Sequence, residues 1–323
     1  MSCTLDEKKV AIVIPLYNDA PNIERAIRSA CEQKLPDGLS VEVIVVDDCS
    51  QDGGPDIVDS LTSEFSNLKF YRQSKNGGPS AARNRALKET DAAWFTPLDS
   101  DDFMEQSRIA DLHAIAEEKQ LDLVADNLLM SSEATPNQVE RELWPDKPAG
   151  PIQLSASFFV NRSYDVDVER SELGFIKPLI HRAKLKDPSA PYVEDLRFGE
   201  DFELYTRMLL DGASAMLVDP AGYYLVRRSG SASHSQAGKD HQRLARICRQ
   251  MLKRPDLSAL ERRAIRGHLD YSEKEWATWT LIEGARKRDM MACAKALFIS
   301  PVAAGHVIQL LGQKALKRTP VNN

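Results

Sequence analysis

Residues 93–102 read AWFTPLDSDD, a mainly apolar run followed directly by three carboxylates. The run from Ala93 to Leu98 predicts a strand, and Asp99 and Asp101 then stand where that strand ends. Mg²⁺ and Mn²⁺ take oxygen ligands, and they use few protein carboxylates when phosphates complete their coordination shell. A short acidic cluster by itself is more often a solvated turn or a helix cap. At a strand end, however, the pair predicts a divalent cation held together with a bound diphosphate.

Upstream of this stretch, short apolar runs alternate with helical patterns. Val10 to Ile14, Val41 to Val46 and Leu68 to Tyr71 are expected strands. The first two are separated by a helix whose apolar residues recur at spacings of three and four, and Asp19 is expected to cap it. Repeated strand–helix–strand units predict a parallel, doubly wound α/β sheet. Ligands of such sheets bind beyond the carboxyl ends of the strands.

The chain after residue 102 is less regular. A helix from Arg108 to Lys119 and a strand from Leu121 to Asn127 are expected. Ser131 to Gly150 is interpreted as a loop or an insertion, because it shows no clear periodicity. A further helix is expected to begin at Phe202, and beyond about Gln236 the pattern is helical and basic. We therefore predict one α/β domain over residues 1–235 and a helical C-terminal extension over residues 236–323.

Further polar side chains follow other expected strands. Tyr17 follows the first strand, and Asp47 follows the second, where its carboxylate can accept hydrogen bonds from a base imide or ribose hydroxyls. Arg83 lies in the first turns of a helix, after the glycine turn at residues 77–78, and it can contact a base or phosphates. The simpler alternatives are that Asp47 caps a helix and that Arg83 is an exposed helix residue.

Four motifs in a fixed order connect the chain to a known family. They are Ile14-Pro15-Leu16-Tyr17-Asn18, Val45-Val46-Asp47-Asp48-Cys49-Ser50, Asn76-Gly77-Gly78 with Ala82-Arg83-Asn84, and Leu98-Asp99-Ser100-Asp101-Asp102. This series resembles the family 2 glycosyltransferases with the GT-A fold. The resemblance covers residues 9 to about 130 and continues to about 235. In detail the chain is similar to bacterial exopolysaccharide transferases of the succinoglycan type.

The resemblance implies both a fold and a reaction. The expected fold is Rossmann-like, with a mostly parallel central sheet flanked by helices and a C-terminal helical extension. The expected activity is the inverting transfer of a sugar from a nucleotide diphosphate sugar, a UDP-sugar, to a glycan acceptor. The acceptor is expected to be lipid-linked, in exopolysaccharide or surface polysaccharide biosynthesis.

The resemblance also implies roles at the matching positions. Asp47 would bind the nucleotide base, expected to be uracil. The nucleoside would be framed by Pro15, Tyr17 and Arg83. Asp99 would approach the ribose or the sugar, and Asp101 would ligate the Mn²⁺ or Mg²⁺ ion. Such an ion neutralises the charge that develops on the departing nucleoside diphosphate.

Asp201, in Gly199-Glu200-Asp201, matches the usual general base of the family. A base is needed because an inverting transfer requires the acceptor hydroxyl to lose its proton during attack. One alternative is that Asp201 only caps the helix that begins at Phe202. Another is that the acidic pair Glu194-Asp195 takes the role instead. His234, in a serine-rich loop, can be a metal or phosphate ligand or simply an exposed residue.

Other functions would need other motifs. A dinucleotide-dependent dehydrogenase would need GxGxxG after the first strand, where Pro15-Leu16-Tyr17-Asn18 stands instead. A nucleotidyltransferase would need a glycine-rich, basic loop there for the triphosphate. A nucleotide-sugar sensor without transferase activity would lack the metal carboxylate or the base, and candidates for both are present. The Gln-x-x-Arg-Trp motif of processive polymer synthases is absent, which favours the addition of single sugars.

Bulk composition agrees with an intracellular enzyme. The formal net charge is −6, which argues against a nucleic-acid binder. The five cysteines form no CxxC pair and are expected to be reduced thiols. No stretch approaches the ~20 continuous apolar residues needed to span a bilayer. We therefore expect a cytoplasmic location, with any membrane contact peripheral, at the inner face of the cell membrane.

The C-terminal segment opposes this acidic balance. From Arg286 to Asn323 there are seven basic residues and one acidic residue, Asp289. Two apolar clusters, at residues 297–299 and 307–311, lie between the basic groups and are separated by Pro301. Two short amphipathic helices of this kind can lie on an anionic membrane surface. The alternative is that they pack on the catalytic domain and that their charges are merely solvated.

Overall fold

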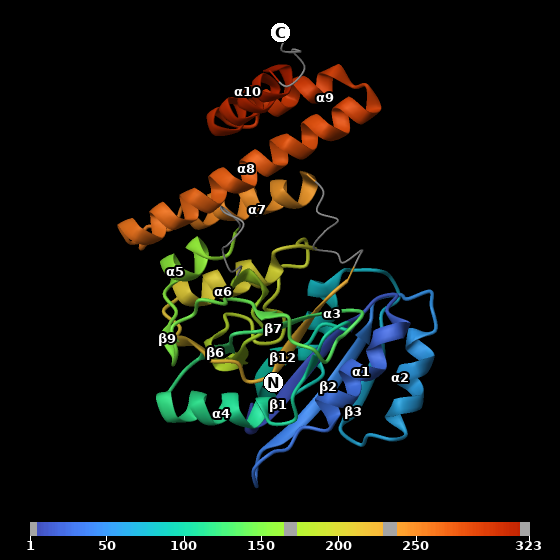
Figure 1. Ribbon diagram of the computed structural model, residues 1–323. Helices are drawn as coiled ribbons and strands as arrows, with labels where there is room; N and C mark the ends of the chain where they lie inside the picture. The colour runs from blue at the N-terminus through green and yellow to red at the C-terminus, as the bar shows by residue number, and fades with distance from the viewer. Residues whose placement is uncertain (1–4, 165–172, 229–237, 317–323) are drawn as a thin grey trace. The chain divides into compact units, whose positions relative to one another are not determined.

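The computed structural model describes residues 5–164, 173–228 and 238–316, with side chains in the last helix described to residue 313. The chain forms two compact units, residues 1–229 and 230–323, and each is considered by itself. Figure 1 follows the chain from its blue N-terminal strands to its red C-terminal helices.

A sheet of eight strands forms the core of the first unit, in the order β3-β2-β1-β4-β10-β6-β11-β9. In that order the strands are Leu68–Arg72, Ser40–Asp47, Asp6–Leu16, Ala92–Pro97, Leu179–His181, Leu123–Asp126, Ala215–Val218 and Ile152–Gln153. The centre of β1, from Val10 to Ile14, is buried on both faces, which explains its unbroken apolar sequence. The first four strands of the order are parallel, as the alternating pattern predicted.

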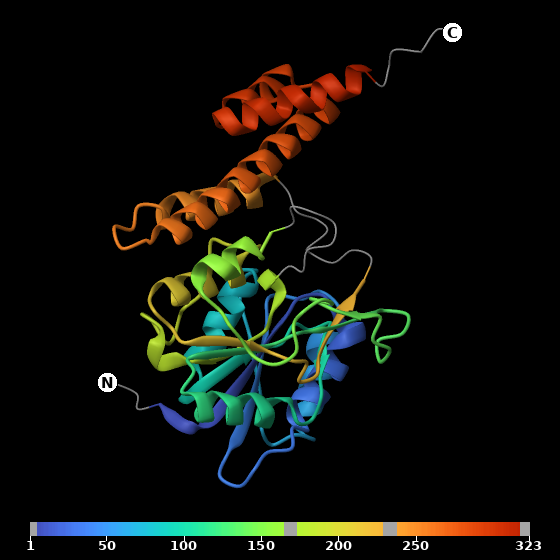
Figure 2. The same cartoon turned by 60° about the vertical axis from the view of Figure 1, so that its left-hand side comes forward.

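The helices of this unit cover both faces of the sheet. They are α1 (Ala20–Cys31), α2 (Gly54–Thr62), α3 (Pro79–Lys88), α4 (Arg108–Lys119), α5 (Ala156–Asn161) and α6 (Glu200–Leu210). Short 3₁₀ turns lie at Leu173–Phe175 and Arg182–Lys184. The connections through α1 and α2 lead outward to β3, whereas α3 leads back past β1 to β4. Since such crossovers are right-handed, α3 lies on the opposite face from α1 and α2 (Figures 1 and 2).

The later part of the unit departs from a simple parallel repeat. β10 lies antiparallel between β4 and β6, and β9 is an antiparallel edge strand. A second sheet has the order β5-β12-β7-β8. Its strands are Phe103–Met104, Tyr223–Arg227, Leu129–Ser132 and Arg141–Glu142.

The interpretation of Ser131 to Gly150 as a loop is therefore wrong in part, because this range contributes to β7 and contains β8. β8 has two residues and pairs with β7, which has four residues and pairs in turn with the distant β12, so neither strand leaves a local periodicity. Asp19 is also not a side-chain cap of α1. Its carboxylate is engaged elsewhere, as described below.

The second unit is helical, as its basic and periodic sequence predicted. It contains α7 (Gly238–Met251), α8 (Ala259–Lys287), α9 (Met290–Lys295), a 3₁₀ turn at Ala296–Phe298, and α10 (Pro301–Leu316). A capping box between Ser258 and Glu261 starts α8. A Cβ atom on Gly284 would lie 2.9 Å from Cys293 Sγ, so glycine permits the close contact of α8 with α9.

A small core holds the last helices on α8. Ala277, Ala296, Ala303 and Val307 are fully buried, and Leu281, Leu297 and Ile299 pack against them. The described cysteines, Cys31, Cys49, Cys248 and Cys293, are free. Among the described helices, none is both long enough and apolar enough to pass through a bilayer.

Candidate functional site

The carboxyl ends of β1 and β2 bring three of the predicted donor-binding residues to one edge of the sheet. Leu16 pairs in register with Asp47, and Pro15 pairs with Val46. Pro15, Tyr17 and Asp47 therefore lie at neighbouring strand ends, with Tyr17 half exposed and Asp47 buried. The structure thus places these three side chains where a doubly wound sheet binds its ligand.

The loops after β1 and β2 are tied together. Ser50 N donates to Asp47 Oδ1 at 3.0 Å, and Asn18 N donates to Ser50 Oγ at 2.9 Å. Gln51 N donates to Asn18 Oδ1 at 2.7 Å. Asn18 and Cys49 have φ angles of 50° and 66°, in the left-handed region that non-glycine residues rarely adopt. These contacts hold the strained loops in place, and such strain is concentrated at functional sites.

Asp48 has a structural role distinct from that of Asp47. Its carboxylate accepts hydrogen bonds from Gly77 N and Gly78 N, both at 2.7 Å. Burial raises the pKa of Asp48, although these two bonds oppose the shift. A Cβ atom on Gly77 would lie 2.8 Å from the Ala81 Cβ atom, so a larger residue does not fit. Asp48 therefore anchors the glycine turn that starts α3 and positions Arg83.

A group of five charged side chains lies beyond the end of β4, four of them buried and the fifth, Asp99, 32% exposed. We call Arg83, Asp99, Lys177, Glu200 and Asp201 the ion cluster. Arg83 donates to Asp99 Oδ1 through Nη2 and to Glu200 Oε1 through Nη1, both at 2.7 Å. Lys177 Nζ lies 2.9 Å from Asp99 Oδ2 and 2.8 Å from Asp201 Oδ2. Arg83 is thus neither exposed nor a helix-surface residue.

The charges of the ion cluster shift the pKa values of its members. Burial opposes ionisation of Asp99, but Lys177 and Arg83 outweigh it and hold the pKa of that carboxyl well below its usual range. Burial likewise disfavours the charged Lys177, yet Asp201 and Asp99 raise the pKa of its ammonium group. The pKa of Glu200 is raised by burial and by the neighbouring Asp201. Three carboxylates surround two cations, so Asp99 and Lys177 remain ionised.

Asp101, the predicted metal ligand, lies in a separate charged group with Asp19 and Arg228. Arg228 Nε is 2.8 Å from Asp101 Oδ2, and Arg228 Nη1 donates to Asp19 Oδ1 at 2.7 Å. Ser100 Oγ donates to Asp19 Oδ2 at 2.6 Å, which explains why Asp19 does not cap α1. Burial and the adjacent Asp99 raise the pKa of Asp101 to about 6, while Arg228 opposes the shift.

The cap that Asp19 was expected to supply comes from the next loop. Asp52 Oδ2 accepts a hydrogen bond from Ala20 N, the first residue of α1, at 2.9 Å. Asp102 is also structural, because it accepts from Tyr223 Oη and Val226 N, both at 2.8 Å. Of the three carboxylates in DSDD, Asp99 and Asp101 contact basic side chains, whereas Asp102 is bonded to a tyrosine hydroxyl and a backbone amide.

The acidic side chains fit a divalent cation only as a shared ligand. Within residues 5–164, 173–228 and 238–316, no three His, Cys, Asp or Glu side chains gather closely enough to hold an ion by themselves. Asp101 and Asp99 supply hard oxygen donors, and Mg²⁺ is commonly held by one or two carboxylates together with substrate phosphates. These residues therefore fit an ion that arrives with a diphosphate.

The two candidates for the general base occupy different surroundings. Asp201, in the first turn of α6, belongs to the ion cluster, and its Oδ1 atom is buried with no hydrogen-bond partner in the described part of the chain. Glu194 and Asp195 are exposed, and Glu194 Oε1 accepts from Asn84 Nδ2 at 3.3 Å. His234 lies outside the described residues.

Three residues of the site were not identified from the sequence: Lys177, Glu200 and Arg228. Lys177 interrupts the apolar run 174–180, which was the available signal for a buried charge. Glu200 stands beside Asp201, and local sequence does not distinguish their roles. Arg228 has no local signal, because its contacts are with residues more than a hundred positions earlier.

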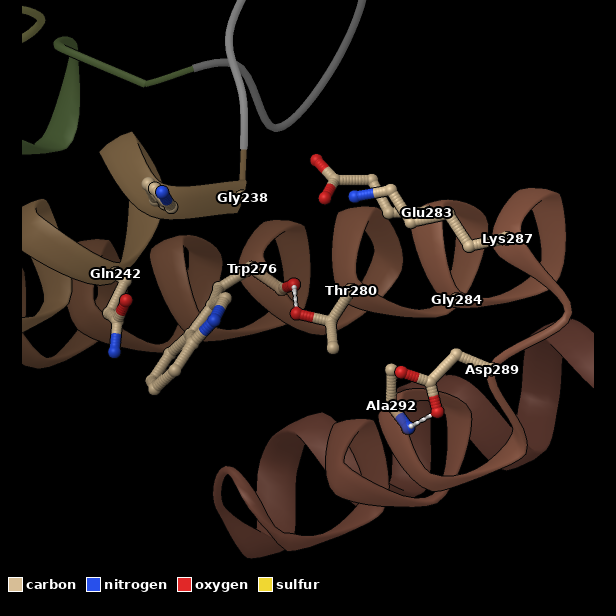
Figure 3. Close-up of a pocket in the computed structure, with 10 residues that line it drawn as sticks. Gly238, Gln242, Trp276, Thr280, Glu283, Gly284, Lys287, Asp289 and Ala292 are labelled. Carbon is tan, nitrogen blue, oxygen red and sulfur yellow. Dashed lines mark hydrogen bonds between the residues drawn. The ribbon is translucent and has the colours of Figure 1, made fainter.

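A separate hollow of about 180 Å³ lies in the helical unit, among residues of α7, α8 and α9. In Figure 3, Thr280 donates a hydrogen bond to the Trp276 carbonyl oxygen, and the Trp276 indole extends between Gln242 and Thr280. Its charged lining residues are Lys239, Glu283, Lys287 and Asp289. None of the site residues predicted from the sequence lines this hollow.

Comparison with known proteins gives one family. The profile of Glycosyl transferase family 2 matches residues 11–166. The succinoglycan biosynthesis protein ExoU of Rhizobium meliloti (strain 1021) is 32% identical over 259 residues, which are 80% of this chain and 74% of ExoU. ExoO of the same organism is 28% identical over 298 residues, which are 92% of this chain and 83% of ExoO.

Solved structures show the same fold. S. aureus TarS 1–349 in complex with UDP-GlcNAc has a TM-score of 0.64 at 20% identity, over 88% of this chain and 89% of that chain. Mannosyltransferase PcManGT from Pyrobaculum calidifontis in complex with GDP-Man and Mn²⁺ has a TM-score of 0.56 at 16% identity, over 97% and 89%. These likenesses confirm the predicted GT-A fold, with its mostly parallel central sheet and helical C-terminal region.

The family profile ends at residue 166, before Lys177, Asp201 and Arg228, but the similarity to ExoU and ExoO extends well beyond it. The identity to ExoU exceeds 30% over most of both chains, and the motifs between Ile14 and Asp102 occur in the expected order. The chain therefore belongs to the family 2 glycosyltransferases.

Proposed function

We propose that this glycosyltransferase moves a single sugar from a UDP-sugar to a glycan acceptor, with inversion, in the biosynthesis of an exopolysaccharide or surface polysaccharide. The observation that carries the proposal is the ion cluster beside Asp101 at the carboxyl ends of the strands. The names of ExoU and ExoO support a polysaccharide product. The UDP-GlcNAc complex of TarS supports a uridine nucleotide as donor.

The donor would lie across the ends of β1, β2 and β4. Pro15 and Tyr17 would frame the nucleoside, and the buried Asp47 carboxylate would accept a hydrogen bond from the uracil imide. Asp99 would approach the ribose or the sugar. Arg83 would contribute by positioning Asp99, because its guanidinium already donates hydrogen bonds to Asp99 and Glu200. Residues 1–235 would form this transferase domain, with residues 236–323 as its extension.

The residues fit a Mn²⁺ or Mg²⁺ ion that Asp101 would ligate together with the donor diphosphate. When bound, such an ion neutralises charge on the departing nucleoside diphosphate. To ligate the ion through Oδ2, Asp101 would exchange its contact with Arg228, whose Nε atom lies 2.8 Å from that oxygen. Arg228 would keep its second contact, in which Nη1 donates to Asp19 Oδ1 at 2.7 Å.

Asp201 would act as the general base. As the acceptor oxygen attacks the anomeric carbon, its proton passes to a carboxylate oxygen of Asp201, and the bond to the diphosphate breaks on the opposite side. Lys177 Nζ donates to Asp201 Oδ2, whereas Oδ1 accepts no hydrogen bond among the described residues and has only Arg83 Nη1 at 3.7 Å, so Oδ1 has the capacity to accept that proton. Glu194 and Asp195 are exposed, whereas Asp201 is buried within the ion cluster, which favours Asp201.

The test measures UDP release from a panel of UDP-sugars with an acceptor extract and Mn²⁺. Asp101→Ala should abolish turnover without unfolding the protein. Asp201→Asn should lower kcat by about 10²–10⁴ with little change in donor affinity, while the matched control Asp195→Asn stays active. Full activity in excess chelator would refute the role of the metal, and an active Asp201→Asn with an inactive Asp195→Asn would reassign the base.

The acceptor is proposed to be lipid-linked and the enzyme to work at the inner face of the cell membrane. The alternatives to transferase activity, a nucleotide-sugar sensor and a nucleotidyltransferase, give different outcomes in the same assay. A sensor would bind the donor without releasing UDP, and a nucleotidyltransferase would release pyrophosphate from a nucleoside triphosphate.

A further inference from the structure

The segment formed by α9, the 3₁₀ turn after it and α10 carries six large apolar side chains that are exposed. We call this set the apolar face: Met290 79% exposed, Met291 70%, Phe298 85%, Val302 37%, Ile308 64% and Leu311 49%. In the rest of the described chain, the large apolar side chains with comparable exposure are Tyr17, Val139 and Leu260. The exposure is therefore concentrated in 22 consecutive residues, whereas single exposed apolar residues are normal elsewhere.

These side chains are not needed to hold the helices in place. Met290, Ala294 and Phe298 recur every four residues and share one side of their helical segment. On α10, Pro301, Gly305, Ile308 and Gly312 recur at spacings of four, three and four, and they are all exposed. Packing on α8 uses the other side, where Ala303 and Val307 are fully buried. The apolar face is thus additional to the core of the unit.

Basic residues border the apolar face. Exposed Arg286, Lys287, Arg288 and Lys295 precede or interrupt it. The single carboxylate of this segment, Asp289, accepts hydrogen bonds from Met291 N and Ala292 N, both at 3.0 Å, and so caps α9. The sequence from 296 to 313 has no Asp, Glu, Lys or Arg. The segment therefore combines an apolar surface with a positive border, in a chain whose formal net charge is −6.

We propose that the apolar face and its basic border bind the surface of an anionic lipid bilayer. Met290, Met291, Phe298 and Ile308 would enter the boundary between head groups and acyl chains, and the cations would lie among lipid phosphates. This inference deepens the membrane location proposed above and rests on it, but lipid binding is measurable without any turnover. The sequence-based prediction named residues 297–299 and 307–311, and of these Leu297, Ile299 and Val307 face the core instead.

A second copy of the chain is the competing occupant. In a twofold contact through this surface, each copy would present the same four cations near those of its partner. Like charges at such a contact oppose association, whereas anionic lipid is attracted to them. The charge pattern therefore favours the bilayer.

The experiment is co-sedimentation of the full chain with vesicles. One set contains phosphatidylglycerol and phosphatidylcholine in equal amounts, and the other contains phosphatidylcholine alone. We expect binding to the anionic vesicles at low ionic strength, and weaker binding in high salt or without phosphatidylglycerol. Phe298→Ser should weaken binding by about ten-fold or more, because a largely exposed aromatic side chain no longer enters the bilayer. Lys295→Gln should weaken it by about five-fold.

Matched controls come from the same unit. Leu260→Ser alters an apolar residue that is 69% exposed on α8, and Arg263→Gln removes an exposed cation from the same helix. Both should leave vesicle binding unchanged. Equal loss in controls and test variants, or full-length chain left in the supernatant at low salt, would overturn the proposal. So would a concentration-dependent dimer in sedimentation velocity that Phe298→Ser converts to a monomer. UDP release in solution serves as a separate readout, and its failure would bear on the catalytic proposal alone.

Discussion

Lys177→Met removes one of the two cations in the ion cluster and leaves the buried Glu200 and Asp201 and the partly exposed Asp99 facing Arg83 alone. Lys177 is buried, and its ammonium group lies 2.9 Å from Asp99 and 2.8 Å from Asp201. Methionine has a similar length, so it fills the space without supplying charge. Its backbone is held independently, because Arg108 Nη2 donates to the Lys177 carbonyl oxygen at 2.6 Å. The substitution therefore tests the charge rather than the packing.

Breaking a buried ion pair by removing one partner costs about 3–5 kcal/mol, since the other partner stays buried and uncompensated. In a unit of this size each kcal/mol lowers Tm by about 2–4 °C, so we expect a decrease of roughly 6–20 °C. The pKa of Asp99 is lowered in the folded protein. Its contribution to the free energy of unfolding is therefore present above the unfolded pKa of about 3.9 and is lost as the pH falls. Loss of Lys177 raises the pKa of Asp99 toward its usual value and reduces what Asp99 contributes to the free energy of unfolding.

Differential scanning calorimetry is the assay, because it can separate the transitions of the two units. Lys184→Met is the control, since Lys184 lies 3.6 Å from Asp122 with its side chain 55% exposed, and exposed pairs contribute about 0–1 kcal/mol. The double variant Lys177→Met/Asp201→Asn should lose less stability than the two single losses added, because residues in contact couple by about 0.5–3 kcal/mol. Strict additivity, or a Lys177→Met variant as stable as Lys184→Met, would refute the account of the ion cluster.

Two further predictions concern other parts of the chain. Gly77→Ala should destabilise the catalytic unit by about 1–3 kcal/mol in chemical denaturation, because the new Cβ atom would lie 2.8 Å from the Ala81 Cβ atom. Gly53→Ala, with no atom within 4 Å of its new Cβ, should be close to neutral, and equal effects at the two sites would contradict the steric explanation. His268 is buried in the helical unit, and burial lowers its pKa to about 3, so the unfolded chain takes up a proton that the folded chain does not. The contribution of neutral His268 to the free energy of unfolding should be complete above the unfolded pKa of about 6.5 and should decrease by about 1.4 kcal/mol per pH unit below it. Melting curves followed by circular dichroism between about pH 7 and pH 5 would show this decrease. His268→Gln should reduce that dependence on pH, and an unchanged slope would assign it to other groups.

Elements with a strong local pattern were predictable from the sequence. The helix Arg108–Lys119 has the predicted bounds, and Val10 to Ile14 forms the buried centre of β1. These segments are long and periodic, so their own side chains determine their structure. β10 is three residues long and lies between two strands that precede it by more than fifty positions. No local pattern specifies such an insertion or its antiparallel direction.

The site divides in the same way. Asp99, Asp101 and Asp47 were predicted as site residues because they follow strands, and the glycine turn before a helix singled out Arg83. What each residue contacts was not predictable, because Arg83 meets Glu200 across 117 positions and Asp101 meets Arg228 across 127. Asp19 is an example: its position before a helix predicted a helix cap, but its carboxylate instead accepts a hydrogen bond from the distant Arg228.

The central place of β10 has a consequence for synthesis on the ribosome. β4 and β6 have no direct pairing in the sheet, and β10 joins them only after residue 181 has been made. A nascent chain that stops before Lys177 can pair β3, β2, β1 and β4, but it leaves one edge of β4 open and lacks three of the five ion-cluster side chains. Unpaired strand edges are prone to aggregation, so chaperone binding is expected to be strongest in this interval. Synthesis of residues 177 to 218 thus supplies both the missing strands of the sheet and the missing side chains of the ion cluster.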